Sequence, residues 1–134
     1  MKTQIVAVLL LALSATEMSG ALDFFQKHVV NKMKPGDCNG KMRAINTDIR
    51  RCKMINTFFL DPQRTLDQIC TSAKNQQTVN INLRYIDCRC CQGNYPDCTY
   101  NHAVGQATEV TVSCNEKHKP YHLVKVVKVE ENNG

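Results

Sequence analysis

The sequence predicts an α+β fold in which helices come first and an antiparallel sheet follows. Amphipathic helical patterns occupy the first half of the chain, whereas alternating segments rich in valine and threonine occupy the second half. The 134 residues fit one domain. The 8 cysteines are typical of a small secreted domain held by disulfides. We therefore expect three helices in the N-terminal half, packed on a curved antiparallel sheet and stapled by disulfides.

The helices are predicted from apolar spacing and from end signals. Residues 23–33 carry apolar side chains on one helical face, and Pro35 ends this helix. A second helix is expected over residues 38–45, with Asp37 as its N-cap. A third begins after Pro62, because proline is favoured in the first helical turn. The apolar face of the first helix consists of Phe24, Phe25, Val29 and Met33.

The strands are predicted from alternation and β-branched residues. Residues 78–86 (TVNINLRYI) alternate between apolar and polar side chains, and a turn is expected at 93–96. Residues 107–114 and 121–129 complete the sheet because they are rich in valine and threonine. Residues 130–134 are expected to form a frayed tail.

The first 21 residues have the pattern of a secretory signal peptide. A positive start is followed by an apolar run over residues 5–13 and by small residues that end at Ala21. A transmembrane anchor is the alternative, but this run is too short to span a bilayer. We expect cleavage after Ala21, which leaves a secreted domain of residues 22–134.

The chain is basic, with a formal net charge of +5. Removal of the leader takes away one basic residue, Lys2, and one acidic residue, Glu17, so the net charge does not change. RNA, heparin-like polymers and anionic membranes would all suit a basic secreted protein. Charge alone therefore selects no partner.

The segment Cys52–Phe58 (CKMINTF) carries the most specific pattern of the chain. A disulfide at Cys52 would hold the ammonium of Lys53 in place, and a fixed cation stabilises charge that develops at a phosphate. Together with His28 upstream and His122 near the end, this segment resembles the CK-x-x-NTF element of the pancreatic ribonuclease (ribonuclease A) superfamily.

This resemblance implies roles for two histidines and one lysine. RNA cleavage by transphosphorylation needs a base, an acid and a cation, and it needs no metal or other cofactor. His28, in FFQKH, matches the general base of the family, and His122, in KPYHL, matches its general acid. Lys53 matches the cation that stabilises the transition state. His118 is the competitor of His122 and is expected to be exposed, whereas His102 lies in no matching motif.

Further residues match the family's substrate-binding positions. Thr57 matches the residue that reads a pyrimidine through its hydroxyl and its backbone N–H. Because a hydroxyl both donates and accepts, it suits either uracil or cytosine. Asp87 matches the carboxylate that supports this threonine, and Asn56 is expected to brace the cleft. Lys27 could contact a phosphate or simply face solvent, and Leu123 is a further predicted substrate-binding residue.

The chain departs from the family pattern at several positions. Lys27 replaces the glutamine that usually precedes the helix histidine. Val124 stands where the family often has an aspartate that orients the imidazole of the acid, so lower activity is expected. The loop that contacts the downstream base is missing, and Glu116 is one residue away from the family's acid at that site. Purine preference at the downstream base is therefore not implied.

Six cysteines have spacings that resemble the conserved frame of the family. The resemblance implies the disulfides Cys38–Cys88, Cys52–Cys98 and Cys70–Cys114. No cysteine follows Cys70 closely, so the local fourth bridge of the pancreatic enzymes is missing, as in the three-disulfide branch that includes the angiogenins.

Cys90 and Cys91 are left over from this frame. Three states of this pair remain open: a strained vicinal disulfide, two free or glutathione-capped thiols, and an intermolecular bridge. A shuffled pairing, in which Cys90 or Cys91 takes the place of Cys88, is also open. Zinc bound by Cys88, Cys90, Cys91 and Cys98 is a further alternative, but the spacing does not fit paired C-x-x-C motifs and the compartment is oxidising.

We therefore expect a secreted endoribonuclease that cleaves single-stranded RNA 3′ to pyrimidines through a 2′,3′-cyclic phosphate. It would be a monomer, or a dimer linked through Cys90 or Cys91. The alternatives are an angiogenin-like signalling ligand that binds a receptor and a cationic antimicrobial protein that binds an anionic cell surface. Angiogenins carry three consecutive arginines where this chain reads Arg43-Ala44-Ile45. The basic residues that favour the antimicrobial alternative are Lys27, Lys32, Lys34, Lys41, Arg43, Arg50 and Arg51.

Overall fold

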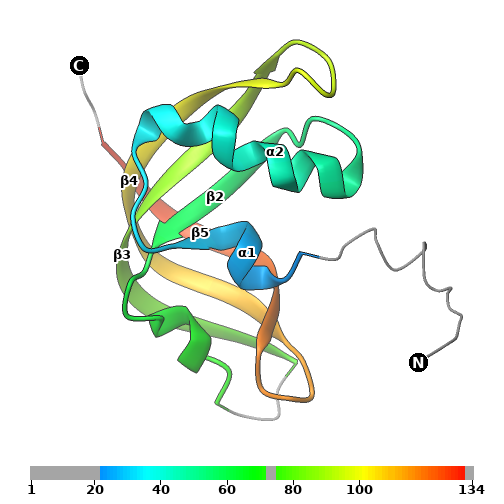
Figure 1. Cartoon of the computed structure of the whole chain (residues 1–134). Helices are drawn as coiled ribbons and strands as arrows, with labels where there is room; N and C mark the ends of the chain where they lie inside the picture. The colour runs from blue at the N-terminus through cyan, green and yellow to red at the C-terminus, as the bar shows by residue number, and fades with distance from the viewer. Residues whose placement is uncertain (1–21, 72–74, 132–134) are drawn as a thin grey trace, which may run out of the picture.

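The computed structural model of the protein describes residues 22–71 and 75–131, apart from the side chain of Cys91. The predicted signal peptide, residues 1–21, lies outside the described residues, as do positions 132–134 of the predicted tail. The described chain forms one curved sheet with two α-helices and two short 3-10 helices (Figure 1). The α+β class predicted from the sequence is confirmed.

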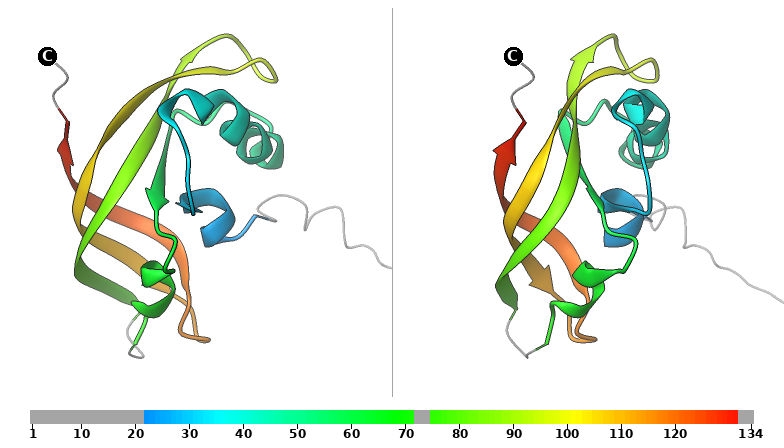
Figure 2. Two further views of the ribbon diagram at one scale, coloured as in Figure 1. Left: turned by 60° about the vertical axis from the view of Figure 1, so that its left-hand side comes forward. Right: turned by 90° about the vertical axis from the view of Figure 1, so that its left-hand side faces the viewer.

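The sheet has five strands in the order β1-β2-β3-β4-β5. β1 pairs with β2 in parallel, and the other neighbours are antiparallel. The long strands β3 and β4 bend strongly along their length (Figure 2). Irregularities of register in β3, β4 and β5 accompany this curvature. The strands are β1 (Val29–Val30), β2 (Ile55–Leu60), β3 (Gln76–Gln92), β4 (Thr99–Cys114) and β5 (Pro120–Glu130).

The first helix is shorter than predicted. α1 spans only Phe24–His28, and a capping box between Asp23 and Gln26 fixes its start. The prediction that this helix extends to residue 33 is wrong, because the β-branched pair Val29–Val30 leaves the helix and forms β1. The early end brings His28 next to β2.

The second helix is longer than predicted. α2 spans Cys38–Ile49, beyond the expected end at residue 45, and stops at Arg50, which has a left-handed backbone. The helix continues because Asn46 is buried and its side chain makes tertiary hydrogen bonds. Asp37 precedes α2 as predicted, but its carboxylate accepts from the backbone N–H of Lys34 instead of capping this helix. The residues Pro35–Asp37 form the 3-10 helix η2.

The third predicted helix is a single 3-10 turn. η3 spans Thr65–Gln68, and the two oxygens of Asp61 accept from the backbone N–H groups of Thr65 and Leu66, each at 2.9 Å. The proline signal at residue 62 therefore marks a turn ahead of the helix, and the carboxylate of Asp61 caps its start. The prediction of a full third helix is wrong in type and length.

Three strands were predicted in the right places but too short, and β2 was not predicted as a strand. β3 and β4 extend well beyond residues 78–86 and 107–114, whereas β5 extends one residue beyond 121–129 at each end. The turn predicted at 93–96 lies between β3 and β4. β2 was missed because its sequence, INTFFL, does not alternate between apolar and polar residues: its positions 56–59 are all buried, including the polar Asn56 and Thr57.

Neighbouring residues of β2 supply two separate hydrophobic clusters. Phe59 packs with Phe24, Leu66 and Tyr85, whereas Phe58 belongs to the cluster that contains Met42 of α2. Successive side chains of a strand point to opposite faces, so β2 joins both clusters. Within the described part of the chain, no helix is long and apolar enough to cross a membrane.

Three disulfides tie the helical half to the sheet. They join Cys38 to Cys88, Cys52 to Cys98 and Cys70 to Cys114, which are the pairs that the resemblance implies. Because Cys88 and Cys98 are each bonded to another cysteine, they are not available as the zinc ligands considered above. Cys90 is disulfide-bonded, so the free or glutathione-capped thiol considered for it is wrong, whereas the Cys91 side chain lies outside the described part.

Candidate active site

A cleft of about 460 Å³ lies between α1, the start of β2 and the edge strand β5. It brings together residues that are up to about a hundred positions apart in the sequence. Seven of the eight predicted catalytic and substrate-binding residues line it: Lys27, His28, Lys53, Asn56, Thr57, His122 and Leu123. The eighth, Asp87, is fully buried and lies behind Thr57. The predicted site residues therefore form one group in space.

His28 ends α1 and is held by the backbone of β2. Its Nδ1 atom lies 2.9 Å from the carbonyl oxygen of Thr57. A carbonyl can only accept, so Nδ1 carries the hydrogen and Nε2 keeps its lone pair. The imidazole also packs against the Phe24 ring, with 5.2 Å between the ring centroids. This geometry leaves Nε2 as the basic atom of the ring.

Burial makes His28 a neutral imidazole at physiological pH. The side chain is 7% exposed, and burial lowers its pKa from 6.5 to about 4. The hydrogen bond to Thr57 opposes this shift, whereas the positive charges of Lys53 and Lys27 add to it, followed by His122. An unprotonated imidazole beside two cations can accept a proton from a bound hydroxyl.

Lys53 is held at the entrance to β2 by a short chain of hydrogen bonds. Its Nζ donates to Oδ1 of Asn56 at 2.8 Å, and Nδ2 of Asn56 donates to the carbonyl oxygen of Lys27 at 2.7 Å. Partial burial, followed by the charges of Lys27 and Arg51, lowers the pKa of Lys53. Asn56 thus connects the ammonium to α1, which also carries His28.

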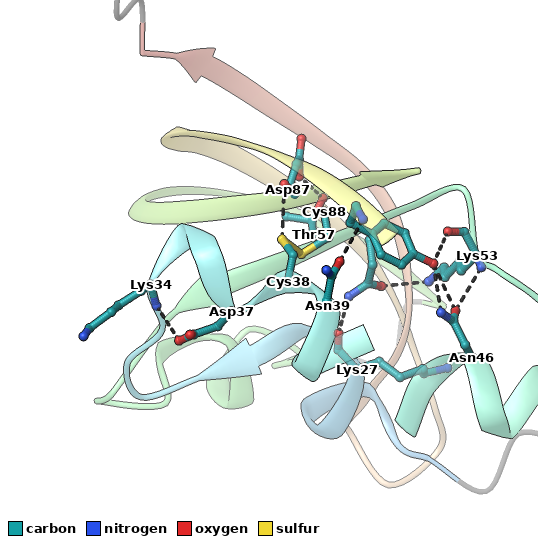
Figure 3. Close-up of a disulfide and its surroundings, with 12 residues drawn as sticks. Lys27, Lys34, Asp37, Cys38, Asn39, Asn46, Lys53, Thr57, Asp87 and Cys88 are labelled. Atoms are coloured by element: carbon teal, nitrogen blue, oxygen red, sulfur yellow. Dashed lines mark hydrogen bonds between the residues drawn. A yellow bond between two sulfur atoms is a disulfide. The ribbon is translucent and has the colours of Figure 1, made fainter. Parts of the chain in front are cut away.

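The backbone of Lys53 is fixed by two residues that the sequence reasoning missed. Its N–H donates to Oδ1 of Asn46 at 2.9 Å, and its carbonyl oxygen accepts from the hydroxyl of Tyr100 at 2.7 Å. Figure 3 shows Asn46 beside Lys53. The disulfide from Cys52 to Cys98 anchors the preceding residue. No local pattern in the sequence marks these two residues, because the burial of Asn46 follows from tertiary contacts.

Thr57 is connected to a charged cluster behind the cleft. Its hydroxyl donates to Oδ1 of Asp87 at 2.7 Å, close to the disulfide Cys38–Cys88 (Figure 3). Asp87 also accepts from Arg89 at 3.2 Å and from Lys128 at 2.9 and 3.0 Å. The sequence reasoning missed Lys128, because no local motif marks it and its partners lie on strands β2 and β3.

His122 lies on β5 and is exposed to the cleft. Val124, two residues further on, is 42% exposed and cannot accept a hydrogen bond from an imidazole. The competing histidines lie elsewhere: His118 is exposed in the turn before β5, and His102 is exposed on β4. The structure thus places His28 and His122 in one cleft, and the other two histidines outside it.

The arrangement offers a neutral base, a fixed ammonium and a second imidazole around one space. Lys27, Lys125 and Lys128 add further positive charge to the same cleft. Such a site attracts an anionic ligand and can stabilise negative charge that grows on it. Among the described residues, no group of three or more histidine, cysteine or acidic side chains is arranged to hold a metal ion.

Comparisons with known proteins match most of the chain. A family model described as pancreatic ribonuclease matches residues 20–127. Pancreatic ribonuclease from Myocastor coypus is 28% identical over 118 residues, which cover 78% of this chain and 92% of that protein. The pancreatic ribonuclease of Notamacropus rufogriseus is 32% identical over 95 residues, which cover 64% of this chain and 77% of that one.

Solved structures share the fold. The structure of SS-RNase-2 matches with a TM-score of 0.64 at 26% identity, and the match covers 79% of this chain and 95% of that one. Green turtle egg white ribonuclease matches with a TM-score of 0.63 at 22% identity, over 78% of this chain and 95% of that one. At this identity the second likeness is one of fold alone.

Proposed function

This chain belongs to the pancreatic ribonuclease family and is a ribonuclease, and on that premise we propose that it is a secreted endoribonuclease that cleaves single-stranded RNA 3′ to pyrimidines. The cut would proceed by transphosphorylation through a 2′,3′-cyclic phosphate. The observation that carries this proposal is the single cleft in which His28, Lys53 and His122 meet.

The first step uses these three residues in different roles. Nε2 of His28 takes the proton of the ribose 2′-hydroxyl, and the 2′-oxygen forms a new bond to phosphorus. The bond from phosphorus to the 5′-oxygen breaks, and His122 gives that oxygen its proton. The ammonium of Lys53 stabilises the negative charge on the phosphorane. In the second step water opens the cyclic phosphate while the two imidazoles exchange roles.

The burial and hydrogen bonds of the cleft support this assignment. The lowered pKa of His28 keeps it unprotonated, as a general base requires. The hydrogen bond to Thr57 leaves Nε2 as the atom that accepts the proton. Lys53 is fixed both through its side chain and through its backbone, so its charge does not have to be repositioned during the reaction.

The base upstream of the cut would be read by Thr57, supported by Asp87. Lys27 would contact a phosphate and Leu123 would contact the substrate from β5, because both line the cleft. The active protein would comprise residues 22–134 after removal of the leader. It would act as a monomer.

Cleavage of a defined dinucleotide tests this proposal. The chain from residue 22 onward should cleave uridylyl-3′,5′-adenosine in the presence of EDTA and release a 2′,3′-cyclic phosphate, detected by phosphorus NMR. The matched control is the double variant His28→Ala, His122→Ala, purified in the same way. Cleavage by the wild type that does not exceed that of the double variant would rule out the proposal.

A cationic host-defence role is a second candidate. Lys41 and Arg43 on α2, together with Arg50 and Arg51 directly after it, are all exposed. Such a basic surface can bind an anionic cell surface. Killing of bacteria that persists in the double variant would support this role independently of RNA cleavage, and killing that is lost with catalysis would exclude it as a separate function.

A further inference from the structure

The ammonium of Lys128 lies within hydrogen-bond distance of three oxygens at the back of the cleft. Nζ lies 3.0 Å from the hydroxyl oxygen of Thr57 and 3.0 and 2.9 Å from the two carboxylate oxygens of Asp87. It also lies 5.2 Å from the centre of the Tyr85 ring, close enough for a cation–π contact. The Lys128 side chain is 24% exposed, and it lines the cleft.

These contacts fix the direction of the Thr57 hydroxyl. An ammonium can only donate, so Thr57 must accept from Lys128. Asp87 lies between Lys128 and Arg89, and as a carboxylate it can only accept. The hydroxyl hydrogen therefore points at Asp87, at the observed 2.7 Å, and one lone pair is taken by Lys128. Only the second lone pair remains for a ligand.

This fixed direction removes the dual character of the hydroxyl. A threonine that both donates and accepts can pair with N3 of cytosine or with N3–H of uracil. Thr57, with its hydrogen engaged by Asp87, offers an acceptor alone. The three hydrogens of the Lys128 ammonium are directed at Thr57 and Asp87, so the lone pair of Thr57 is the group that faces the base. This acceptor matches the N3–H donor of uracil, whereas cytosine presents an acceptor at N3.

We propose that Lys128 makes this cleft selective for uridine over cytidine by locking the hydroxyl of Thr57 as an acceptor. The inference deepens the proposed function and rests on it, because it names the base that the same cleft reads. Cytosine could bind only if the hydrogen bond from Thr57 to Asp87 were broken, or if its acceptor at N3 faced the acceptor lone pair of Thr57. An unpaired or mispaired buried polar group is costly, so a ten- to hundredfold preference is expected, on the order of 1–3 kcal/mol.

The kinetic test compares two dinucleotides that differ only in the base. Wild type should cleave uridylyl-3′,5′-adenosine with a kcat/KM about ten- to hundredfold above that for cytidylyl-3′,5′-adenosine. Lys128→Met should reduce this ratio to about threefold or less, because without the ammonium on its other side the Thr57 hydroxyl can turn its hydrogen from Asp87 toward N3 of cytosine. Lys125→Met is the matched control: it removes the same charge from the same strand and cleft, and it should lower both values without changing the ratio.

Each outcome decides the proposal. A wild-type ratio near one, or a ratio that Lys128→Met leaves unchanged, overturns it while the ribonuclease function stands. An equal rise of the activities on both dinucleotides in Lys128→Met also overturns the proposal. Lys128 would then block access to the Thr57 hydroxyl equally for both bases. If Lys125→Met lowers the ratio as much as Lys128→Met does, the preference comes from the positive charge of the cleft in general. The proposed locking of the Thr57 hydroxyl is then rejected as well.

A binding measurement on the wild type keeps the test independent of the variant's folding and of catalysis. Uridine 3′-phosphate should bind at least about tenfold more tightly than cytidine 3′-phosphate in calorimetric titrations. Equal binding, or tighter binding of the cytidine nucleotide, refutes the selectivity even if RNA is cleaved. Selective binding without any cleavage would support the lock at Thr57 and reject the proposed catalysis.

Discussion

The Nδ1 atom of His28 and the backbone carbonyl oxygen of Thr57 are 2.9 Å apart, although the two residues are separated by 29 positions. This one hydrogen bond joins α1 to β2 and sets the tautomer of the imidazole. The side chain of the same threonine is bonded to Asp87 and Lys128. One residue therefore positions the proposed base through its backbone and carries on its side chain the hydroxyl that we propose as the reader of the substrate base.

The pH dependence of cleavage should reflect the burial of His28. Its pKa of about 4 predicts that kcat/KM for a uridine dinucleotide stays high in mild acid and falls with an inflection near pH 4. An ordinary histidine would give this inflection near pH 6.5. Rates between pH 3.5 and 8, together with an NMR titration of the His28 ring, provide the measurement. An acid limb that bends near pH 6.5 would show that the base is solvated.

The stability of the protein should fall in mild acid for the same reason. The unfolded chain protonates His28 below about pH 6.5, whereas the folded protein does so only below about 4. Since the unfolded state then binds more protons, the free energy of unfolding decreases as the pH falls through this window. The loss should approach about 3 kcal/mol at pH 4 and be zero above pH 7.

Urea unfolding of wild type and of His28→Gln at several pH values measures this contribution. From pH 7.5 to pH 4, the free energy of unfolding of the wild type should fall by about 3 kcal/mol relative to that of the variant, because the variant has no imidazole at this position. A difference that does not change with pH would show that the folded state protonates His28 as readily as the unfolded chain does.

Replacement of Lys53 should affect the chemical step. Lys53→Met is expected to lower kcat about 10²- to 10³-fold with little change in KM, because the ammonium is needed most when charge develops on phosphorus. Lys27→Met removes a charge from the same cleft and should lower kcat/KM by about tenfold or less. Steady-state kinetics in EDTA provide both values. Equal losses in the two variants would mean that Lys53 contributes only general positive charge.

Tyr100 should act as a positioning residue for Lys53. Tyr100→Phe removes the hydroxyl that donates to the Lys53 carbonyl and accepts from Nδ2 of Asn46 at 2.9 Å. We expect a loss of about 1–2 kcal/mol in the free energy of unfolding and a roughly three- to tenfold lower kcat. The matched control is Tyr95→Phe, at a tyrosine that is 39% exposed. A stability loss with unchanged kcat in the fully folded variant would make Tyr100 purely structural.

The helices of the first half and the strands of the second half could be predicted because local patterns encode them, whereas β1 and β2 within the first half were missed. The alternation over residues 78–86 agrees with the half-buried odd positions Val79, Ile81 and Leu83 of β3. The early end of α1 and the length of α2 could not be predicted, because β1 pairs with β2 and because Asn46 bonds to Tyr100 in β4. Those contacts span distances that a local pattern does not report.

The sequence by itself determined which residue types could form a phosphate-cleaving site: two histidines, a lysine beside a cysteine, and the asparagine and threonine of one short segment. Only the tertiary structure decided that they line one cleft, that burial keeps His28 neutral, and that Lys128 faces Thr57 and Asp87. The reason is physical. A motif fixes the chemical groups, whereas solvation and hydrogen-bond direction depend on neighbours that the fold brings in from distant strands.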